Sequence, residues 1–197
     1  MTLPRLCVVV SGGGRSLENL AELTESGALQ AELALVLSDR ESAGALARAQ
    51  RLGIPSQVIR HKDFDGPQAF ATAVFAAMQA ADCQLAVLAG FLRLLLPPAE
   101  WAARVINIHP ALLPKFGGKG FYGERVHQAV IAAGDKESGC TVHYVDQQYD
   151  HGTHILQRRI QVAEDETAES LAARVFEEEK LALPEAIRMV LASHAGN

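Results

Sequence analysis

The sequence predicts a single α/β domain built on a mostly parallel, doubly wound sheet, with antiparallel strands at one edge and a long C-terminal helix. Three observations support this prediction. Short, continuously apolar runs alternate with longer runs of helical periodicity, which is typical of parallel strands covered by helices on both faces. Two runs after residue 138 alternate apolar and polar residues, as antiparallel edge strands do. The final run has the pattern of one long amphipathic helix.

The first half of the chain alternates strands and helices regularly. Gly27 and Gly53 follow helical patterns and indicate helix ends, while Pro67 suits a first helical position. The expected strands span residues 6–11, 31–39, 55–59, 83–90 and 103–109, and the expected helices span residues 16–27, 42–53 and 66–82.

The second half begins with a glycine-rich loop at 116–125 that carries two exposed-looking aromatic residues. A helix at 125–134 is expected next, then strands at 139–145 and 154–162. The last helix, at 167–194, begins near Thr167 and Glu169, and Pro184 is expected to bend it or break it in two.

Composition excludes several classes of protein. The 197 residues carry a net charge of -5, which argues against a nucleic-acid partner. The longest apolar run is interrupted by Arg93 and Pro97-Pro98, too early for a membrane span, and the N-terminus lacks a signal-peptide pattern. Three widely spaced cysteines indicate buried free thiols. A cytoplasmic protein is therefore expected.

The segment "SGGGRS", residues 11–16, lies between the first strand and the first helix, where open α/β sheets bind anions. Gly12 and Gly14 fit a dinucleotide-binding pattern, but Leu17 stands where its third glycine belongs. A P-loop pattern is also missing. A phosphate-sized ligand is favoured over a plain glycine turn because Arg15 and Ser16 add hydrogen-bond donors.

Asn107 and His109 lie two positions apart on a predicted strand, so their side chains face the same way. An amide can donate to a developing oxyanion while an imidazole transfers a proton, which suits acyl chemistry on a carbonyl. No activated serine or cysteine accompanies them in the sequence. The attacking group is therefore expected to come from a substrate. The alternative is an ordinary histidine that is hydrogen-bonded in the core.

Two further segments are candidates for binding. Residues 146–154 collect Asp146, Asp150, His151 and His154, which could hold a metal, although the spacing makes this the weaker interpretation. A carboxylate from this loop could instead pair with His109 and raise its pKa. Residues 89–98 are too apolar for an ordinary loop. Core packing and a wall for a flat aromatic ligand, with an acidic tail near Arg93, are about equally compatible with them.

Together these segments resemble the phosphoribosylglycinamide formyltransferase family. "VVVSGGGRSLENL" is similar to the family's S-G-x-G-[ST]-N-L opening, and "LAGFLRLL" to its A-G-[FY]-M-R-[IL]-L folate segment. "NIHPALLPKF" resembles N-I-H-P-S-L-L-P-x-[FY], and "GCTVHYVDQQYDHGTHILQ" resembles the later stretch that contains D-x-G. The resemblance implies a Rossmann-like formyltransferase fold. It also implies transfer of a formyl group from 10-formyltetrahydrofolate, a co-substrate, to the amine of glycinamide ribonucleotide, with no metal.

Matched positions imply the roles of individual residues. The catalytic set is Asn107, His109 and Asp150. The ribotide-binding set is Gly12, Gly13, Gly14, Arg15, Ser16 and Glu179. The folate-binding set is Leu92, Arg93, Leu94, Leu95, Asn107, Asp146, Gln147, Gln148, Tyr149 and Asp150. Residues 1–197 would form one formyltransferase domain, with about 1–100 binding the ribotide phosphate and about 101–197 supplying the catalytic and folate-binding part.

The chain departs from the family pattern at three places. Arg15-Ser16 replaces the usual Ser/Thr-Asn, Pro67 stands where relatives often have an arginine that Arg60 or Lys62 could replace, and "GGKGFYGERVH" replaces P-G-x-H-[AT]. The last segment borders the ribotide in relatives, so contacts there cannot be transferred.

Three alternative functions remain. A formyltetrahydrofolate deformylase would carry an additional N-terminal domain, and a methionyl-tRNA formyltransferase an additional C-terminal domain, so both are less favoured for this acidic chain. A non-catalytic module that binds a nucleotide or a metal is the third. The expected partners are small-molecule substrates, with no nucleic acid and no membrane, in a monomer or homodimer.

Overall fold

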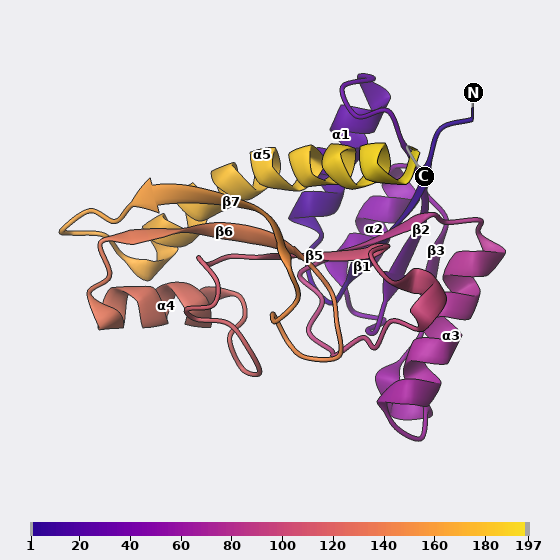
Figure 1. Ribbon diagram of the computed structural model, residues 1–197, viewed down its shortest axis with the longest axis horizontal. Coiled ribbons are helices and arrows are strands. Elements are labelled where there is room, and N and C mark those ends of the chain that lie inside the picture. The colour runs from indigo at the N-terminus through magenta and orange to yellow at the C-terminus, as the bar shows by residue number, and fades with distance from the viewer. Residues whose placement is uncertain (1, 196–197) are drawn as a thin grey trace.

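The computed structural model describes residues 2–195, which form a seven-stranded sheet flanked by helices (Figure 1). The strand order is β3-β2-β1-β4-β5-β6-β7. The strands are β1 (Arg5–Val10), β2 (Glu32–Ser38), β3 (Ser56–Val58), β4 (Leu85–Ala89), β5 (Val105–His109), β6 (Glu137–Tyr144) and β7 (His154–Gln161). The first five pair in parallel, whereas β6 and β7 are antiparallel.

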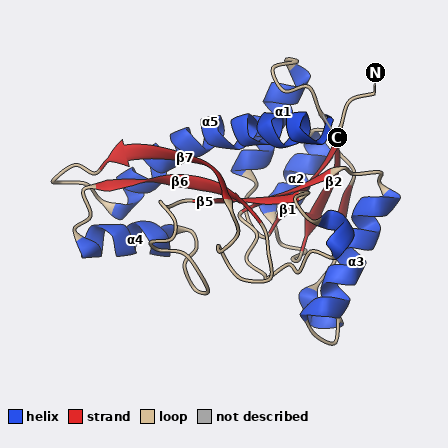
Figure 2. Cartoon of the chain, viewed as in Figure 1, coloured by secondary structure: helices blue, strands red, loops and turns tan. Residues whose placement is uncertain are grey.

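Helices cover both faces of the sheet (Figure 2). They are α1 (Arg15–Glu25), α2 (Gly44–Arg51), α3 (Pro67–Ala80), α4 (Glu124–Ala133) and α5 (Ala168–Ala195), with short 3-10 helices η1 (His61–Asp63) and η2 (Ala99–Trp101). One hydrophobic core gathers buried residues of α1, α2, α4 and α5 on the sheet, and a second gathers those of α3 on the opposite face. The predicted fold class is confirmed, because the apolar strands are buried on both sides.

The sheet places the ends of three strands side by side. Because β4 pairs with both β1 and β5, the carboxyl ends of these parallel strands lie along one edge, in the order β1, β4, β5. Neighbouring strands are about 4.8 Å apart, so the chain leaving β1 is roughly 10 Å from the chain leaving β5. The glycine segment leaves β1, and the Asn107–His109 pair ends β5.

Pro184 was expected to bend the last helix or break it in two, and the structure shows no break. α5 runs without interruption from Ala168 to Ala195 with Pro184 inside it. Pro184 is buried among the residues that pack α5 on the sheet, and this packing stabilises the helix beyond what the missing backbone donor costs. The predicted start is confirmed, because the Thr167 hydroxyl accepts the backbone N–H of Ser170 at 3.1 Å as a helix cap.

The structure also agrees with the predicted exposure of the glycine-rich loop, in which Phe121 and Tyr122 are exposed. Cys7, Cys83 and Cys140 are free and buried, as the sequence predicted. Within residues 2–195, none of the helices combines the length and the apolar character that crossing a membrane would require.

Candidate active site

Asn107, His109 and Asp150 come together where β5 ends. The first two lie on the same face of β5, and Asp150 lies in the loop after β6, which pairs antiparallel with β5. The amide Nδ2 of Asn107 lies 3.3 Å from Oδ1 of Asp150, and Nδ1 of His109 lies 3.5 Å from Oδ2 of the same carboxylate. Asp150 itself adopts a left-handed backbone conformation, with φ at 52°.

His143 is a fourth member of this cluster, and the sequence analysis did not assign it a role. It faces Asn107 across the β5–β6 pair, and its Nε2 lies 3.0 Å from Nδ2 of Asn107. Its Nδ1 lies 2.8 Å from the carbonyl of Tyr144, which can only accept, so Nδ1 carries a proton. In the neutral ring Nε2 then accepts from Asn107. The strand alternation of "CTVHYV" could have indicated this position, because His143 must face one side of an edge strand.

These contacts change what is expected of Asn107. One N–H of its amide points to His143 and the other to Asp150. To donate to an oxyanion, as the sequence analysis expected, Asn107 must release one of them. The contact with Asp150 is the longer of the two, so it is the weaker and the more easily released.

The proton positions of His109 follow from its neighbours. Nε2 lies 2.8 Å from the backbone carbonyl of Phe116, which only accepts, so Nε2 carries the proton of the neutral ring. Nδ1 faces Asp150 and is the atom that gains a proton when the imidazolium forms. Burial lowers the pKa of His109 below its ordinary value, although Asp150 and the Phe116 carbonyl oppose this. Asp150 thus raises this pKa, as the sequence analysis predicted for a carboxylate from this loop, but burial outweighs the attraction.

Asp150 is held ionised by its partners. Burial alone would raise its pKa, but contact with His143, the charge of His109 and the backbone N–H of Gly118 lower it overall. The Gly118 N–H lies 2.9 Å from Oδ2. Because the folded-state pKa lies below the ordinary value, ionised Asp150 stabilises the fold at neutral pH, and this contribution is lost as the pH falls through the folded value.

The glycine-rich loop has to approach this cluster closely. A Cβ on Gly117 would lie 2.4 Å from Cδ2 of Leu113 and 3.3 Å from Cβ of Asp150. A side chain at position 117 would require the Leu113 side chain to move, so glycine favours the approach in which residues 116–118 bring a carbonyl to His109 and an N–H to Asp150.

The segment 12–16 turns from β1 into α1, as the sequence analysis expected of an anion cradle. Gly14 precedes the helix with φ at 80°, and no side chain caps it. A Cβ there would lie 2.6 Å from Cβ of Ala45, so α2 packs directly against this turn. The first N–H groups of α1 lack intrahelical acceptors and are free to bind an anion, beside the positive end of the helix dipole.

Arg15 extends from the cradle toward α5. Its guanidinium carbon lies 3.9 Å from the ring centroid of Phe176, which is a cation–π contact. Glu179, one turn further along α5, is partly buried. Burial raises the pKa of Glu179 to about 7, and the charge of Arg15 lowers it in part. The structure thus brings Glu179 near the residues predicted to share its ligand.

Replacing Glu179 with glutamine is expected to stabilise the protein at alkaline pH. The pKa of Glu179 is raised from 4.5 to about 7, so the ionised carboxylate costs stability once the pH exceeds this range. Above pH 7 the variant should gain on the order of 1–3 kcal/mol, and below about pH 4 it should match the wild type. Urea unfolding across this pH range measures the difference. Glu177→Gln, an exposed change on the same helix, is the control. Parallel stability curves for E179Q and the wild type would contradict the expectation.

The two predicted folate segments lie in contact. Nε2 of Gln147 donates to the carbonyl of Pro97 at 3.1 Å, which joins the 146–150 loop to the chain after β4. Arg93 is ion-paired with Asp39 at 2.9 Å. Leu95 is 1% exposed and belongs to the core on the α3 face, so it packs the segment after β4 against that core. Leu92 and Leu94 are partly exposed.

The residues weighed as metal ligands do not come together in one group. Asp146 bonds to His151 at 2.7 Å, Asp150 belongs to the cluster at β5, and His154 begins β7. Over residues 2–195, no three His, Cys, Asp or Glu side chains are grouped to hold a metal ion.

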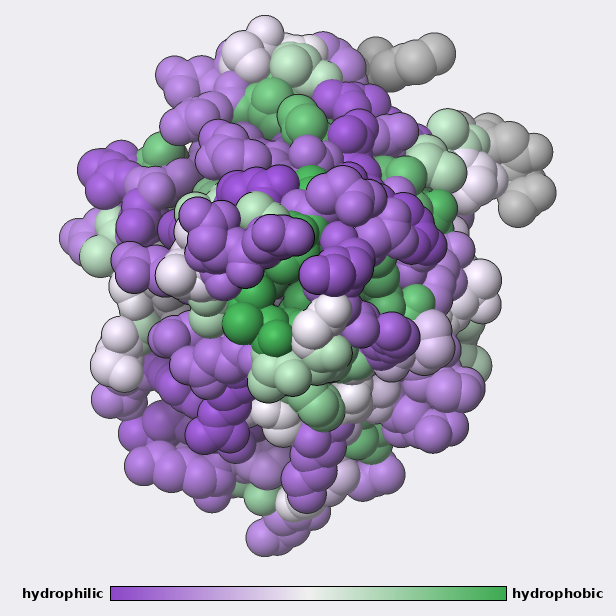
Figure 3. All heavy atoms as spheres, turned by 90° about the vertical axis from the view of Figure 1, so that its left-hand side faces the viewer, coloured by the Kyte–Doolittle hydropathy of each residue, from purple (hydrophilic) through white to green (hydrophobic). Residues whose placement is uncertain are grey.

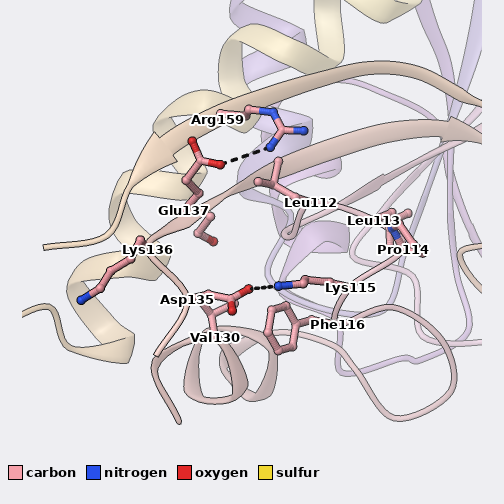
Figure 4. Close-up of a pocket in the computed structure, with 11 residues that line it drawn as sticks. Leu112, Leu113, Pro114, Lys115, Phe116, Val130, Asp135, Lys136, Glu137 and Arg159 are labelled. Carbon is pink, nitrogen blue, oxygen red and sulfur yellow. Dashed lines mark hydrogen bonds and ion pairs between the residues drawn. The ribbon is translucent and has the colours of Figure 1, made fainter. Parts of the chain in front are cut away.

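A cavity of about 390 Å³ is lined by residues 112–116, by Val130 of α4 and by residues around the start of β6 (Figure 4). Among its lining residues, Phe116 also contacts the cluster at β5, through its carbonyl. Leu112, Pro114 and Val130 give it apolar walls, and the ion-paired Lys115 and Asp135 are also among its lining residues. The same side of the molecule shows hydrophobic atoms in a hollow framed by hydrophilic residues (Figure 3). None of the predicted catalytic residues lines this cavity.

Comparisons with known proteins agree with this arrangement. The sequence pattern of the formyl transferase family matches residues 4–187. Phosphoribosylglycinamide formyltransferase of Haemophilus influenzae is 33% identical over 188 residues, which are 94% of this chain and 86% of that protein. The trifunctional purine biosynthetic protein adenosine-3 of Drosophila melanogaster is 39% identical over 95% of this chain, but the chain spans only 14% of that protein's length.

Solved structures show the same fold. Glycinamide ribonucleotide transformylase 1 from Symbiobacterium toebii superposes with a TM-score of 0.88 at 35% identity, covering 95% of this chain and 87% of the other. Phosphoribosylglycinamide formyltransferase from Brucella melitensis superposes with a TM-score of 0.82 at 37% identity, covering 95% of each chain.

Proposed function

The chain belongs to the formyl transferase family, and on that premise we propose that it transfers a formyl group from 10-formyltetrahydrofolate to the amine of glycinamide ribonucleotide. The products are formylglycinamide ribonucleotide and tetrahydrofolate, in purine biosynthesis. The observation that carries this proposal is the convergence of Asn107, His109 and Asp150 at the end of β5, on the sheet edge that also carries the anion cradle.

The reaction needs no nucleophile from the protein. Within residues 2–195, the polar contacts of His109 are to the carbonyl of Phe116 and the carboxylate of Asp150. His109 therefore has no serine or cysteine as a polar partner there. The substrate amine attacks the formyl carbon, a C–N bond forms, and the formyl oxygen becomes an oxyanion. The Asn107 amide and His109 protonated at Nδ1 stabilise that charge. Asp150 stabilises the imidazolium and organises proton transfer through water, so the bond to N10 of the folate breaks with a proton delivered to the nitrogen.

The two substrates bind to different segments of the chain. The residues up to about 100 hold the ribotide phosphate at Gly12–Ser16, and those from about 101 supply the catalytic groups. Glu179 binds the ribose hydroxyls, and the contacting segments around Leu92 and Gln147 enclose the pterin. No metal takes part. We place the enzyme in the cytoplasm, since its buried free thiols suit a reducing compartment. We expect it to be a monomer or a homodimer.

Formyl transfer is expected to require the ribotide. The purified protein, mixed with 10-formyltetrahydrofolate, should release tetrahydrofolate only when glycinamide ribonucleotide is present, because the attacking amine belongs to that substrate. Folate absorbance follows the turnover, and mass spectrometry identifies the formylated ribotide. Turnover without the ribotide would instead indicate a deformylase, and binding of a nucleotide or zinc without turnover would indicate a non-catalytic module.

A further inference from the structure

Phe176 is an aromatic residue of α5 that none of the predicted ligand-binding sets includes. The guanidinium of Arg15 lies over its ring, with the central carbon 3.9 Å from the ring centroid. Arg15 is the first residue of α1 and is exposed, whereas Phe176 is partly buried. This contact therefore joins the glycine turn, where the ribotide phosphate is proposed to bind, to the C-terminal helix.

The packing of α1 against α5 fixes the place of this ring. One turn after Arg15, the amide Nδ2 of Asn19 donates to the backbone carbonyl of Lys180 at 3.0 Å, and Lys180 lies one turn after Phe176. Residues four apart share one face of a helix, so the two helices meet along the faces that carry Arg15 and Phe176. Glu179, three positions after Phe176, lies on the same side of α5. Phe176 thus lies beside both the first turn of α1 and the carboxylate proposed to bind the ribose.

Arg15 carries its charge where a helix disfavours a cation. The N-terminus is the positive end of the helix dipole, and an acidic side chain in the first turn offsets such a charge. The acidic residue of this turn is Glu18, but its carboxylate pairs with Arg48 and Arg51 of α2. Within the part of the chain that the structure describes, Arg15 is ion-paired with no carboxylate. The start of α1 therefore has an excess of positive charge, which suits an anionic ligand group.

Stacking on Phe176 restricts the guanidinium without using its hydrogen-bond donors. The N–H groups of a guanidinium lie in its plane, so a contact through its face leaves them available to an anion. An unrestrained arginine loses rotamer freedom when it binds a phosphate, and a ring that already holds the guanidinium lowers this cost. Arg15 also stands where the family pattern has serine or threonine, so its side chain adds a cation that the pattern lacks.

We propose that Phe176 is a positioning residue, whose ring holds the Arg15 guanidinium beside the first turn of α1 so that it binds the phosphate of the ribotide together with the backbone N–H groups. This inference rests on the proposed function and deepens it, because it names the pair of side chains that adds charge recognition to the glycine turn. Phe176 acts on the substrate through Arg15 and takes no part in formyl transfer.

Calorimetric binding to the whole protein measures this role. We expect Phe176→Leu, which removes the ring but keeps an apolar side chain, to raise the Kd for glycinamide ribonucleotide about twofold to fivefold. Arg15→Ala should raise it about ten- to a hundredfold, as loss of a charged hydrogen bond does. The KM for the ribotide should follow, whereas kcat and the KM for 10-formyltetrahydrofolate should change little. Phe176→Tyr, which keeps the ring, should bind as the wild type does.

A double-mutant cycle separates positioning from packing or direct contact. If Phe176 acts through Arg15, the variant that carries both R15A and F176L should bind the ribotide as weakly as R15A alone. Binding of the same substrate without its phosphate should be unchanged in each of these variants, because Arg15 contacts only the phosphate. Met189→Ala, an exposed apolar change on the same helix, is the matched control.

The outcomes distinguish this inference from the proposed function. If the wild-type protein shows ribotide-dependent turnover and F176L keeps its affinity for the ribotide, the inference is wrong and the function stands. Equal losses in F176L and F176Y, weaker binding of the substrate without phosphate, or losses that multiply in the double variant would indicate packing or direct contact and would also overturn it. If the wild-type protein shows no ribotide-dependent turnover, the function and the inference fail together.

Discussion

Replacing His109 with alanine is expected to lower kcat for formyl transfer roughly a thousandfold while the KM values of both substrates change little. The imidazole gains its second proton at Nδ1, which faces Asp150, the carboxylate that the amide of Asn107 also contacts. Its charge matters only when the formyl oxygen becomes negative. The interaction therefore exists mainly in the transition state, and its loss lowers kcat rather than ground-state binding.

Steady-state kinetics with 10-formyltetrahydrofolate and glycinamide ribonucleotide measure this effect. His194→Ala is the control, because His194 is exposed and contacts the carbonyl of Ala103, beyond the opposite end of β5. Thermal unfolding and substrate calorimetry on H109A check that the variant folds and binds. A folded H109A variant that turns over at nearly the wild-type rate would refute the catalytic role of the cluster.

The second large effect is expected from replacing Asp150 with asparagine, which should lower kcat by about two to three orders of magnitude. Asparagine keeps an oxygen that can accept from Gly118 but removes the charge that opposes the effect of burial on His109. The pKa of His109 should therefore fall further in this variant, and the imidazolium should become harder to form.

The pH dependence tests this reasoning separately from the rate. Titration of the His109 ring by NMR should give a lower pKa in D150N than in the wild type, because the attraction from the carboxylate is lost and the burial remains. Asp165→Asn, an exposed change in the turn before α5, is the control for removal of one negative charge. An unchanged or higher pKa for His109 in D150N would show that Asp150 acts on the reaction by another route.

Local patterns were sufficient to predict the elements of the fold. The burial of β1, β4 and β5 on both faces follows from their continuous apolar runs, and the helix ends follow from glycine and capping residues, as at Thr167. The placement of Asn107 and His109 on one face followed from the two-residue period of a strand. Pro184 is the exception, since burial of α5 in the core that also holds α1, α2 and α4 outweighed a local rule.

The composition of the site was less predictable, because several of its contacts use the backbone. The Phe116 carbonyl that fixes the proton on His109 and the Gly118 N–H that holds Asp150 are groups every residue carries. Side-chain identity does not reveal them. The stacking of Arg15 on Phe176 joins positions far apart in the chain, and no local period relates them.

Short-range spacing and residue type were enough to predict the class of fold, the glycine turn before α1 and the pair on β5. Packing in three dimensions set the strand order, the membership of His143 in the cluster and, within residues 2–195, the lack of a hydrogen-bond partner at Nδ1 of His127. It also decided the direction in which the pKa of His109 moves. These properties depend on burial and on distances between segments remote in sequence, and burial exists only once the chain has packed around the site.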